Sequence, residues 1–334
     1  MNKVKKAFSL IEVIFVLVIL GIVASISSQI IVQVYENYIT QKALYNTTTK
    51  TEIAINQIVN RLTYAINGTT VTKKPHTSTY TDPYTAGSKG TNWIKLSDID
   101  VNNNNHRQFT TIEWIGYDND SFATTATPLW SGLAKYDTAG GATRESFETP
   151  GSNLNFVATI MNNLSEGKVD LNNSNPAAVI FSQENDFYRT GVEYDPTCMG
   201  LIETNNTSCI FPVKIGTNIA GNDTNLTFTR ATDANHANPL PKIITERYKL
   251  AWSAYALVPE DKDGDNLYDL NLYYNYQPWN NETYKDGKKS LLINNISVFK
   301  FTENGGVIQL KLCASENIGK DYNISSCKEK AIIR

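Results

Sequence analysis

The feature that most constrains this chain is an apolar run of membrane length near its start, which contains one carboxylate, Glu12. The run extends from Phe8 to Val34 and can span the ~30 Å of hydrocarbon in a bilayer. A carboxylate in hydrocarbon costs at least ~2.5 kcal/mol, so it needs a partner. No basic residue lies between Phe8 and Gln41. The partner of Glu12 must therefore come from outside this segment.

Helix-compatible sequence continues beyond the apolar run without proline. Apolar residues recur at helical spacing, at Ile55, Ile58, Val59, Leu62 and Ile66. We therefore predict one helix over residues 8–66, transmembrane over about 8–34 and amphipathic in its second half, where it packs on a globular domain. Lysines 3, 5 and 6 precede the span, which predicts that the bulk of the chain lies outside the cytoplasm.

Three simpler interpretations of the apolar run compete with an assembly role. A secretory signal peptide needs a small-residue cleavage site, and Ser25-Ile26-Ser27 is a passable one, but Glu12 argues against it. An ordinary single-span anchor leaves Glu12 unexplained. A buried soluble helix conflicts with the length of the run and with the lysines that flank it.

The segment Lys6-Ala7-Phe8-Ser9-Leu10-Ile11-Glu12-Val13 resembles the class III leader of type IV pilins and type II secretion pseudopilins. The resemblance covers roughly the first 30 residues, with the basic leader, the aromatic residue, the glutamate and the apolar run in register. It implies that residues 1–7 are a leader, that prepilin peptidase cuts between Ala7 and Phe8, and that the new amino group of Phe8 is methylated. It also implies that Glu12 neutralises the amino group of Phe8 on a neighbouring subunit.

The chain departs from the family pattern at two positions. Ala7 stands where glycine usually precedes the cut, and the stretch Ile26 to Ile31 lacks the proline that kinks the helix of major pilins. The missing proline and the large C-terminal part favour a minor subunit. The largest tip-type pseudopilin typically lacks the glutamate, so Glu12 argues against that assignment.

Residues 67–334 are expected to form a β-rich periplasmic domain, with a possible insertion at about 139–239. The sequence predicts a strand over Phe109–Tyr117, shorter strands at Ala178–Ser182 and Leu226–Thr229, and a hairpin of two alternating segments around residues 248–256 and 270–276. A second hairpin turns at Asn304-Gly305-Gly306. The expected fold class is α+β, with the long helix packed on an antiparallel sheet, as in the larger pilin-like minor subunits.

Four cysteines fall into two close pairs that lack the spacing of a zinc site or a thioredoxin-like site. The prediction is two local disulfides, Cys198–Cys209 and Cys313–Cys327, with free thiols as the alternative. Such bonds need an oxidising compartment, which agrees with export to the periplasm. The final segment is expected to be a C-terminal loop pinned by the second disulfide and closed by one more strand.

An acidic loop begins at Asp261 and has the carboxylate spacing of a calcium loop. Asp261, Asp263, Asp265 and Asp269 occupy relative positions one, three, five and nine, and the carbonyl of Leu267 would fill position seven. The loop resembles hairpin calcium modules and departs from the EF-hand, because Leu272 stands where a bidentate glutamate would be. The alternative is a polar hairpin loop. We expect Ca²⁺ to be the cofactor.

No catalytic motif of a hydrolase, metalloprotease or phosphate-binding enzyme occurs, so we expect no enzymatic activity. The net charge of −3 gives no indication of nucleic-acid binding, so we expect no nucleic-acid partner. The expected role is a minor pilin or pseudopilin that initiates fibre assembly or contacts cargo. Its expected partners are other subunits, prepilin peptidase and the inner-membrane assembly platform. The alternatives are a surface adhesin, a DNA-uptake minor pilin, or a plain single-span protein with a periplasmic binding domain.

Overall fold

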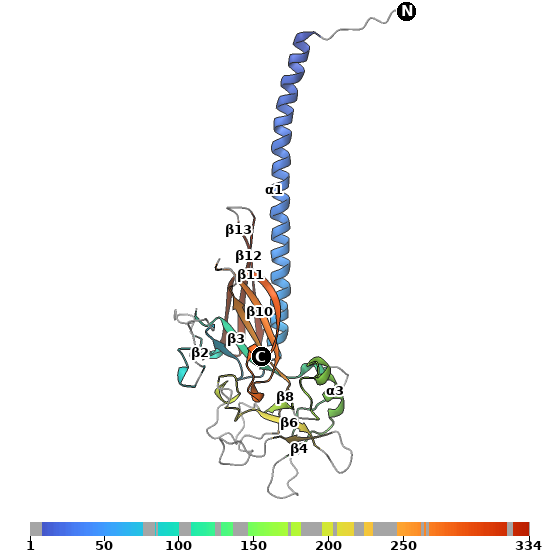
Figure 1. Ribbon diagram of the computed structural model, residues 1–334, viewed down its shortest axis with the longest axis vertical. Helices are drawn as coiled ribbons and strands as arrows, with labels where there is room; N and C mark the ends of the chain where they lie inside the picture. Colours follow the sequence, from blue (N-terminus) through green and yellow to red (C-terminus); the bar gives the residue numbers. More distant parts are fainter. Residues whose placement is uncertain are drawn as a thin grey trace, which may run out of the picture.

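One long helix and two antiparallel sheets form the protein in the computed structural model (Figure 1). The structure describes residues 9–75, 84, 86–99, 108–123, 128–135, 146–172, 175–181, 196–202, 206–216, 224–229, 246–261, 264, 267–318 and 323–333. The long helix, α1 (Leu10–Leu62), contains 53 residues and is therefore ~80 Å long. Its first half projects away from both sheets.

Helix α1 ends at Leu62, before the Ile66 boundary expected from apolar spacing. Thr63 caps the helix, and its amide donates to the carbonyl of Val59 at 2.9 Å. The next residues leave the helix because they pair with a strand: Ala65 forms an antiparallel bridge with Gly116, and the Ile66 amide donates to the carbonyl of Ile115. The apolar side chain of Ile66 is buried by this strand contact rather than by a helical turn.

The larger sheet has eight described strands in the order β13-β12-β11-β10-β9-β3-β1-β2, all antiparallel to their neighbours. The second half of α1 packs on one face of it, and the shared core includes Ile55, Ile58, Leu272, Ile293 and Leu310. The strands are β1 (Val71–Lys73), β2 (Trp93–Lys95), β3 (Thr111–Gly116), β9 (Ser253–Glu260), β10 (Tyr268–Tyr276), β11 (Lys288–Asn304), β12 (Val307–Asn317) and β13 (Asn323–Ile333).

This arrangement confirms the α+β fold class and the hairpin predicted at Asn304-Gly305-Gly306. The first predicted hairpin is confirmed in part: the segment around residues 270–276 lies in β10 and pairs with β9, but residues 249–251 form a strand of the second sheet instead. Strands β11 and β12 join through Gly305 and Gly306, whose φ angles of +57° and +77° favour glycine. The predicted strand at 109–117 is β3.

The second sheet has five described strands in the order β4-β7-β6-β5-β8. Four of them and helix α3 (Leu154–Leu164) fall within the hypothesised insertion at about 139–239, whereas β8 lies beyond it and leads directly into β9. Aromatic side chains fill the core of the second sheet region, among them Phe147, Phe181, Phe228 and Trp130. The strands are β4 (Ser146–Glu148), β5 (Ala177–Ile180), β6 (Phe211–Ile215), β7 (Asn225–Phe228) and β8 (Lys249–Ala251).

A third apolar cluster joins the two sheets. Ile115, Ala254 and Ala256 of the larger sheet belong to it, together with Ala178 and Ile180 of the second sheet. The second sheet lies at the end of the molecule opposite the projecting half of α1 (Figure 1). The short helices among the described residues are α2 (Asn119–Phe122), η1 (Ala86–Ser88), η2 (Leu96–Asp98), η5 (Pro196–Cys198), η6 (Pro278–Asn280) and η7 (Tyr284–Asp286).

Candidate functional site

The first half of α1 is an apolar surface that no other described part of the chain covers. Among the described residues, α1 is the one helix long and apolar enough to cross a membrane. No residue of its most apolar stretch is buried. Large side chains such as Leu17, Leu20 and Ile31 are more than half exposed. Exposed apolar surface of this length fits a single membrane span, because its exposure to water would be energetically unfavourable.

Glu12 lies in the first turn of α1 and is exposed. Its amide donates to the Ser9 side chain at 3.4 Å, so Ser9 caps the helix. A carboxylate in this turn is favoured by the partial positive charge of the helix N-terminus. The next basic residue along α1 is Lys42, which is ~45 Å away along the helix axis. Ala7 and Phe8, the predicted processing residues, lie outside the described residues.

The second half of α1 buries one stripe of side chains against the larger sheet. Its buried residues follow one another at intervals of one, three or four positions, which places them on one helix face. They are Ala43, Thr47, Thr51, Ala54, Ile55, Ile58 and Leu62. This stripe fixes the globular part rigidly to the helix.

Polar contacts reinforce the same attachment at the strands β12 and β13. Glu52 of α1 accepts from Lys328 at 3.1 Å and from Lys330 at 3.3 Å. Hydrogen bonds from these two lysines lower the pKa of Glu52 below its ordinary value. The buried Thr47 hydroxyl donates to Glu316 at 3.1 Å. Because these partners are more than 260 positions apart in the sequence, no local pattern could have indicated them.

The outward face of α1 beyond the apolar run carries exposed aromatic and aliphatic side chains. Tyr35, Tyr38, Tyr45 and Ile53 lie on the side opposite the buried stripe, and each is more than half exposed. A helix face of this kind is suited to packing against another helix. This face was not predicted from the sequence, although its tyrosines at i, i+3 and i+10 follow the helical period.

Both predicted disulfides are present, and the described residues include no free cysteine. Cys313 and Cys327 are directly opposed residues of β12 and β13, with Cα atoms 4.1 Å apart. The prediction of a C-terminal loop pinned by this disulfide is therefore wrong in one respect. Both cysteines lie within long strands, because β12 continues to Asn317 and β13 starts at Asn323. The other disulfide joins Cys198 of η5 to Cys209, just before β6.

The acidic loop connects β9 to β10. Asp261 Oδ1 accepts from the amide of Gly264 at 2.7 Å, and Gly264 has φ of +71°, so the loop begins with a tight turn. Asp269 lies opposite Glu260 in the strand register, and the Glu260 carboxylate is paired with Lys289. Asp263 and Asp265 lie outside the described residues. In the part of the chain that the structure describes, no cluster of three or more metal-binding side chains occurs.

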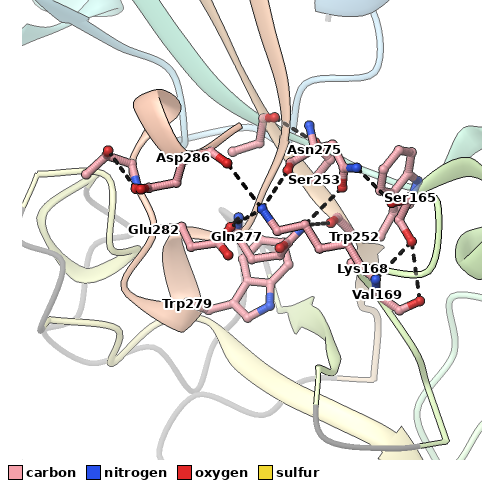
Figure 2. Close-up of polar contacts among 12 residues, drawn as sticks. Ser165, Lys168, Val169, Trp252, Ser253, Asn275, Gln277, Trp279, Glu282 and Asp286 are labelled. Carbon is pink, nitrogen blue, oxygen red and sulfur yellow. Dashed lines mark hydrogen bonds and ion pairs between the residues drawn. The ribbon is translucent and has the colours of Figure 1, made fainter. Parts of the chain in front are cut away.

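A polar network joins the second sheet region to the end of β10 (Figure 2). Lys168, beyond α3, donates to the Asn275 carbonyl at 3.0 Å and pairs with Glu282 at 2.9 Å. Asn275 has φ of +58°, and its side chain donates to the Ser165 carbonyl at 2.8 Å. The bend at Asn275 interrupts the β9–β10 register and aims this amide at the α3 segment. The network therefore holds the two sheets in one orientation.

A buried ionic cluster lies between β1, β3 and β10. Lys73 pairs with Glu113, and both side chains are at most 5% exposed. Lys73 also donates to the Leu201 carbonyl at 2.5 Å, and Tyr276 donates to Glu113 at 2.7 Å. Burial and the Glu113 charge raise the pKa of Tyr276 well above its ordinary value. Each polar group has a partner, so this cluster is a structural element of the core.

Comparison with known proteins identifies the start of the chain. Residues 2–28 match the family described as the prokaryotic N-terminal methylation motif, which is the class III prepilin leader of type IV pilins and pseudopilins. The match covers the basic leader, Glu12 and most of the apolar run, and it confirms the resemblance seen in the sequence. This motif implies processing by prepilin peptidase and assembly with other pilin subunits. No curated protein and no solved structure is similar enough to this chain to count as a match.

Proposed function

We propose that this chain, which carries the class III prepilin leader, is a minor pilin or pseudopilin. It would be a structural subunit of a type II secretion pseudopilus or a type IV pilus that initiates fibre assembly or contacts cargo. The observation that carries the proposal is the methylation motif at residues 2–28. It overlaps the start of a helix whose first half exposes apolar side chains and whose second half packs on a large sheet. The role is structural and involves no reaction catalysed by the chain.

In the proposed assembly, prepilin peptidase cuts between Ala7 and Phe8, and the amino group of Phe8 is methylated. Glu12 of one subunit then neutralises this amino group on its neighbour. Each charge alone would be costly in hydrocarbon, and together they satisfy one another, which sets the axial register of insertion. The described part of α1 offers Glu12 no basic partner of its own, which supports a partner in another subunit.

The proposed location is the inner membrane, crossed once, with the C-terminal domain in the periplasm, followed by incorporation into a fibre. Lysines 3, 5 and 6 support this orientation, because basic residues beside a first span favour the cytoplasmic side. The two disulfides fit an oxidising compartment. The exposed face formed by Tyr35, Tyr38, Tyr45 and Ile53 offers a surface for packing against neighbouring helices in the fibre.

Two features support a minor role rather than that of the bulk subunit. The apolar half of α1 continues without a proline, and the second sheet adds a large region at the end farthest from the membrane segment. A region at that end would face away from the membrane in an assembled fibre. Cargo contact through this region is therefore part of the proposal.

The test is a Glu12→Ala substitution in cells that otherwise lack the chain. We expect the variant to enter the membrane normally but to be at least tenfold depleted from sheared fibres or detergent-extracted assemblies, because its neighbour's amino group loses its counter-charge. Glu36→Ala is the matched control, since Glu36 is an exposed glutamate of the same helix beyond the apolar run. Normal incorporation of the Glu12→Ala chain would favour a plain single-span protein with a periplasmic binding domain.

The machine that the subunit serves is tested separately in a deletion strain. Loss of protein secretion would support the pseudopilus, and loss of surface fibres would support a pilus. Loss of adhesion or DNA uptake with both processes intact would favour the alternative roles of adhesin or DNA-uptake minor pilin.

We also propose that Ca²⁺ binds the acidic loop through Asp261, Asp263, Asp265, the carbonyl of Leu267 and Asp269. Oxygen ligands at alternate positions suit Ca²⁺. Four carboxylates within nine positions would repel one another without a cation, which supports a cation here. The proposed effect is to hold the β9–β10 hairpin closed.

The calcium proposal is tested by thermal unfolding of the full chain in detergent. Ca²⁺ should raise the melting temperature, EGTA should reverse the shift, and Mg²⁺ at equal concentration should not reproduce it, because Mg²⁺ prefers smaller octahedral sites. Asp263→Ala should abolish the shift. A melting temperature that neither EGTA nor Asp263→Ala changes would contradict the proposal.

A further inference from the structure

Strand β13 is an unusually long and regular sheet edge. The other described edge strands, β2, β4 and β8, have three residues each, whereas β13 has 11 and pairs with β12 without a register shift. Natural proteins protect edges by making them short, bulged, charged or interrupted by proline, because an open edge invites another strand. Strand β13 has neither a bulge nor a proline, and its three charged side chains are engaged in ion pairs, Lys328 and Lys330 with Glu52 and Glu329 with Lys311.

The direction of the free backbone groups on β13 follows from the β11–β12 hairpin. Its two-residue turn makes Asn304 and Val307 a hydrogen-bonded pair, so Cys313 also directs its N–H and C=O towards β11. Cys327, opposite Cys313, is then in a non-bonded pair, and their Cα separation of 4.1 Å agrees. Cys327 and every second residue therefore direct their N–H and C=O away from the sheet.

These outward-facing residues are accessible. They alternate with residues that bond to β12, and each of them is exposed: Ser325, Cys327, Glu329, Ala331 and Ile333. In the described part of the chain, their backbone groups have no hydrogen-bond partner. Helix α1 contacts β13 through the other side chains, Lys328 and Lys330, so the edge itself stays open.

We propose that β13 is a docking edge for an extended acidic strand donated by a different protein. The donated strand would extend the larger sheet by one strand, with main-chain hydrogen bonds at alternate residues from Ser325 to Ile333. The acidic character follows from charge: Lys328 and Lys330 share a single carboxylate, Glu52, which leaves a net positive charge beside the edge. A carboxylate on the added strand, opposite these lysines, would neutralise it.

A second copy of this chain is a poor occupant of the edge. Two identical edges pair about a two-fold axis, which makes the two strands antiparallel. Strand β13 runs in the same direction as α1, because Thr47 contacts Glu316, which lies opposite Ile324, while the later Glu52 contacts Lys328 and Lys330. Antiparallel pairing would therefore point the two apolar helices in opposite directions, and they could not enter one membrane with the same orientation.

The test uses the full chain in detergent micelles and a fluorescein-labelled peptide, Thr-Val-Glu-Val-Glu-Val-Thr, as the donated strand. We expect saturable binding by fluorescence polarisation. The matched peptide with lysine in place of both glutamates should bind about tenfold more weakly, because opposite-charge pairs across strands favour pairing. Absence of binding by the glutamate peptide, or equal binding by the lysine peptide, would overturn the proposal.

Two further probes show whether binding uses the backbone of the edge. Ala331→Pro removes an outward amide without removing a bond to β12, and should weaken binding by about tenfold or more, whereas Ala331→Thr should bind as the parent does. N-methylation of the peptide amides that face β13 should abolish binding to the unaltered chain, and N-methylation of the other amides should preserve it. This peptide pair keeps the test decisive if Ala331→Pro misfolds.

Equal binding of both methylated peptides would overturn strand addition. Dimerisation of the full chain that Ala331→Pro abolishes would assign the edge to a second copy and would also overturn the proposal. The test does not depend on fibre assembly, so it can fail or succeed independently of the Glu12→Ala experiment.

Discussion

The two halves of α1 share one continuous helix but are stabilised by different surroundings. Large apolar side chains are exposed all around the first half, from Leu10 to Val34. The second half buries one stripe, adds polar contacts at Thr47 and Glu52, and leaves an outward face exposed. A uniformly apolar surface suits lipid on every side, whereas a single apolar stripe suits one protein neighbour.

The first half is therefore free to pack against lipid or other helices without disturbing the folded domain. The second half has the opposite constraint, because each change there acts on the larger sheet. Substitutions placed in the two halves should therefore have separable effects on membrane assembly and on domain stability.

The largest expected difference comes from truncating one isoleucine in each half. Ile58 is 1% exposed in the core beneath α1, so Ile58→Ala should lower the free energy of unfolding by about 4 kcal/mol. Ile19→Ala, in the apolar half, should change it by less than about 0.5 kcal/mol. Guanidinium unfolding of the full chain in non-ionic detergent, followed by tryptophan fluorescence, measures both. Equal losses would show that the two halves are not independent.

Removing one disulfide at a time should separate effects on the larger sheet, which packs on α1, from effects on the region around Cys198 and Cys209. The double substitutions Cys313→Ala with Cys327→Ala, and Cys198→Ala with Cys209→Ala, should each cost about 3 kcal/mol, because the closed loops are of similar length. Only the first should increase hydrogen exchange in residues 43–62 of α1, since β12 and β13 contact this half. Similar exchange in the two variants would contradict the attachment described for β12 and β13.

A smaller effect is expected at the hydroxyl of Thr47. Thr47→Val keeps the volume of the buried side chain but removes the hydrogen bond to Glu316, and should cost about 1 kcal/mol. Thr40→Val is the control, because Thr40 is an exposed threonine of the same helix. Chemical unfolding at neutral pH measures both variants, and equal stabilities would show that the contact is energetically neutral.

The smallest effect is expected at Glu52 and should depend on pH. Lys328 and Lys330 lower the pKa of folded Glu52, so its stabilising effect is present above the unfolded-state pKa of about 4.5 and is lost as the pH falls through the lower folded-state value. Glu52→Gln should slightly lower the unfolding midpoint at pH 7, and the difference should shrink in acid. A difference that stays constant from neutral to acid pH would exclude the ion pairs as its cause.

Several parts of the fold and the candidate site could be predicted because they depend on local sequence. The apolar run, the leader around Glu12 and the turn at Gly305-Gly306 are each encoded within a short segment. The disulfide partners are also close in the chain, with separations of 11 and 14 positions. These predictions were confirmed because neighbouring residues alone carry the signal.

Other features escaped prediction because distant segments create them. The second sheet joins short strands from residues 146 to 251. The strands predicted at 178–182 and 226–229 correspond to β5 and β7, but their pairing into one sheet with β4, β6 and β8 was not predicted. Helix α1 ends at Leu62 and not at the predicted Ile66, because Ala65 forms a β-bridge with Gly116. The Cys313–Cys327 bond lies inside a ladder rather than at the ends of a loop, because the pairing of β12 with β13 extends beyond it.

Local sequence was sufficient to predict a methylation-type leader, a membrane-length helix that carries a carboxylate in its first turn, and an α+β domain with two local disulfides. The folded chain was needed to show which strands cover the apolar face of α1, which two lysines meet Glu52, and that β13 is left as a long open edge. The physical reason is that helical period, hydropathy and turn chemistry are local properties. Strand order and side-chain partners depend instead on contacts between residues hundreds of positions apart.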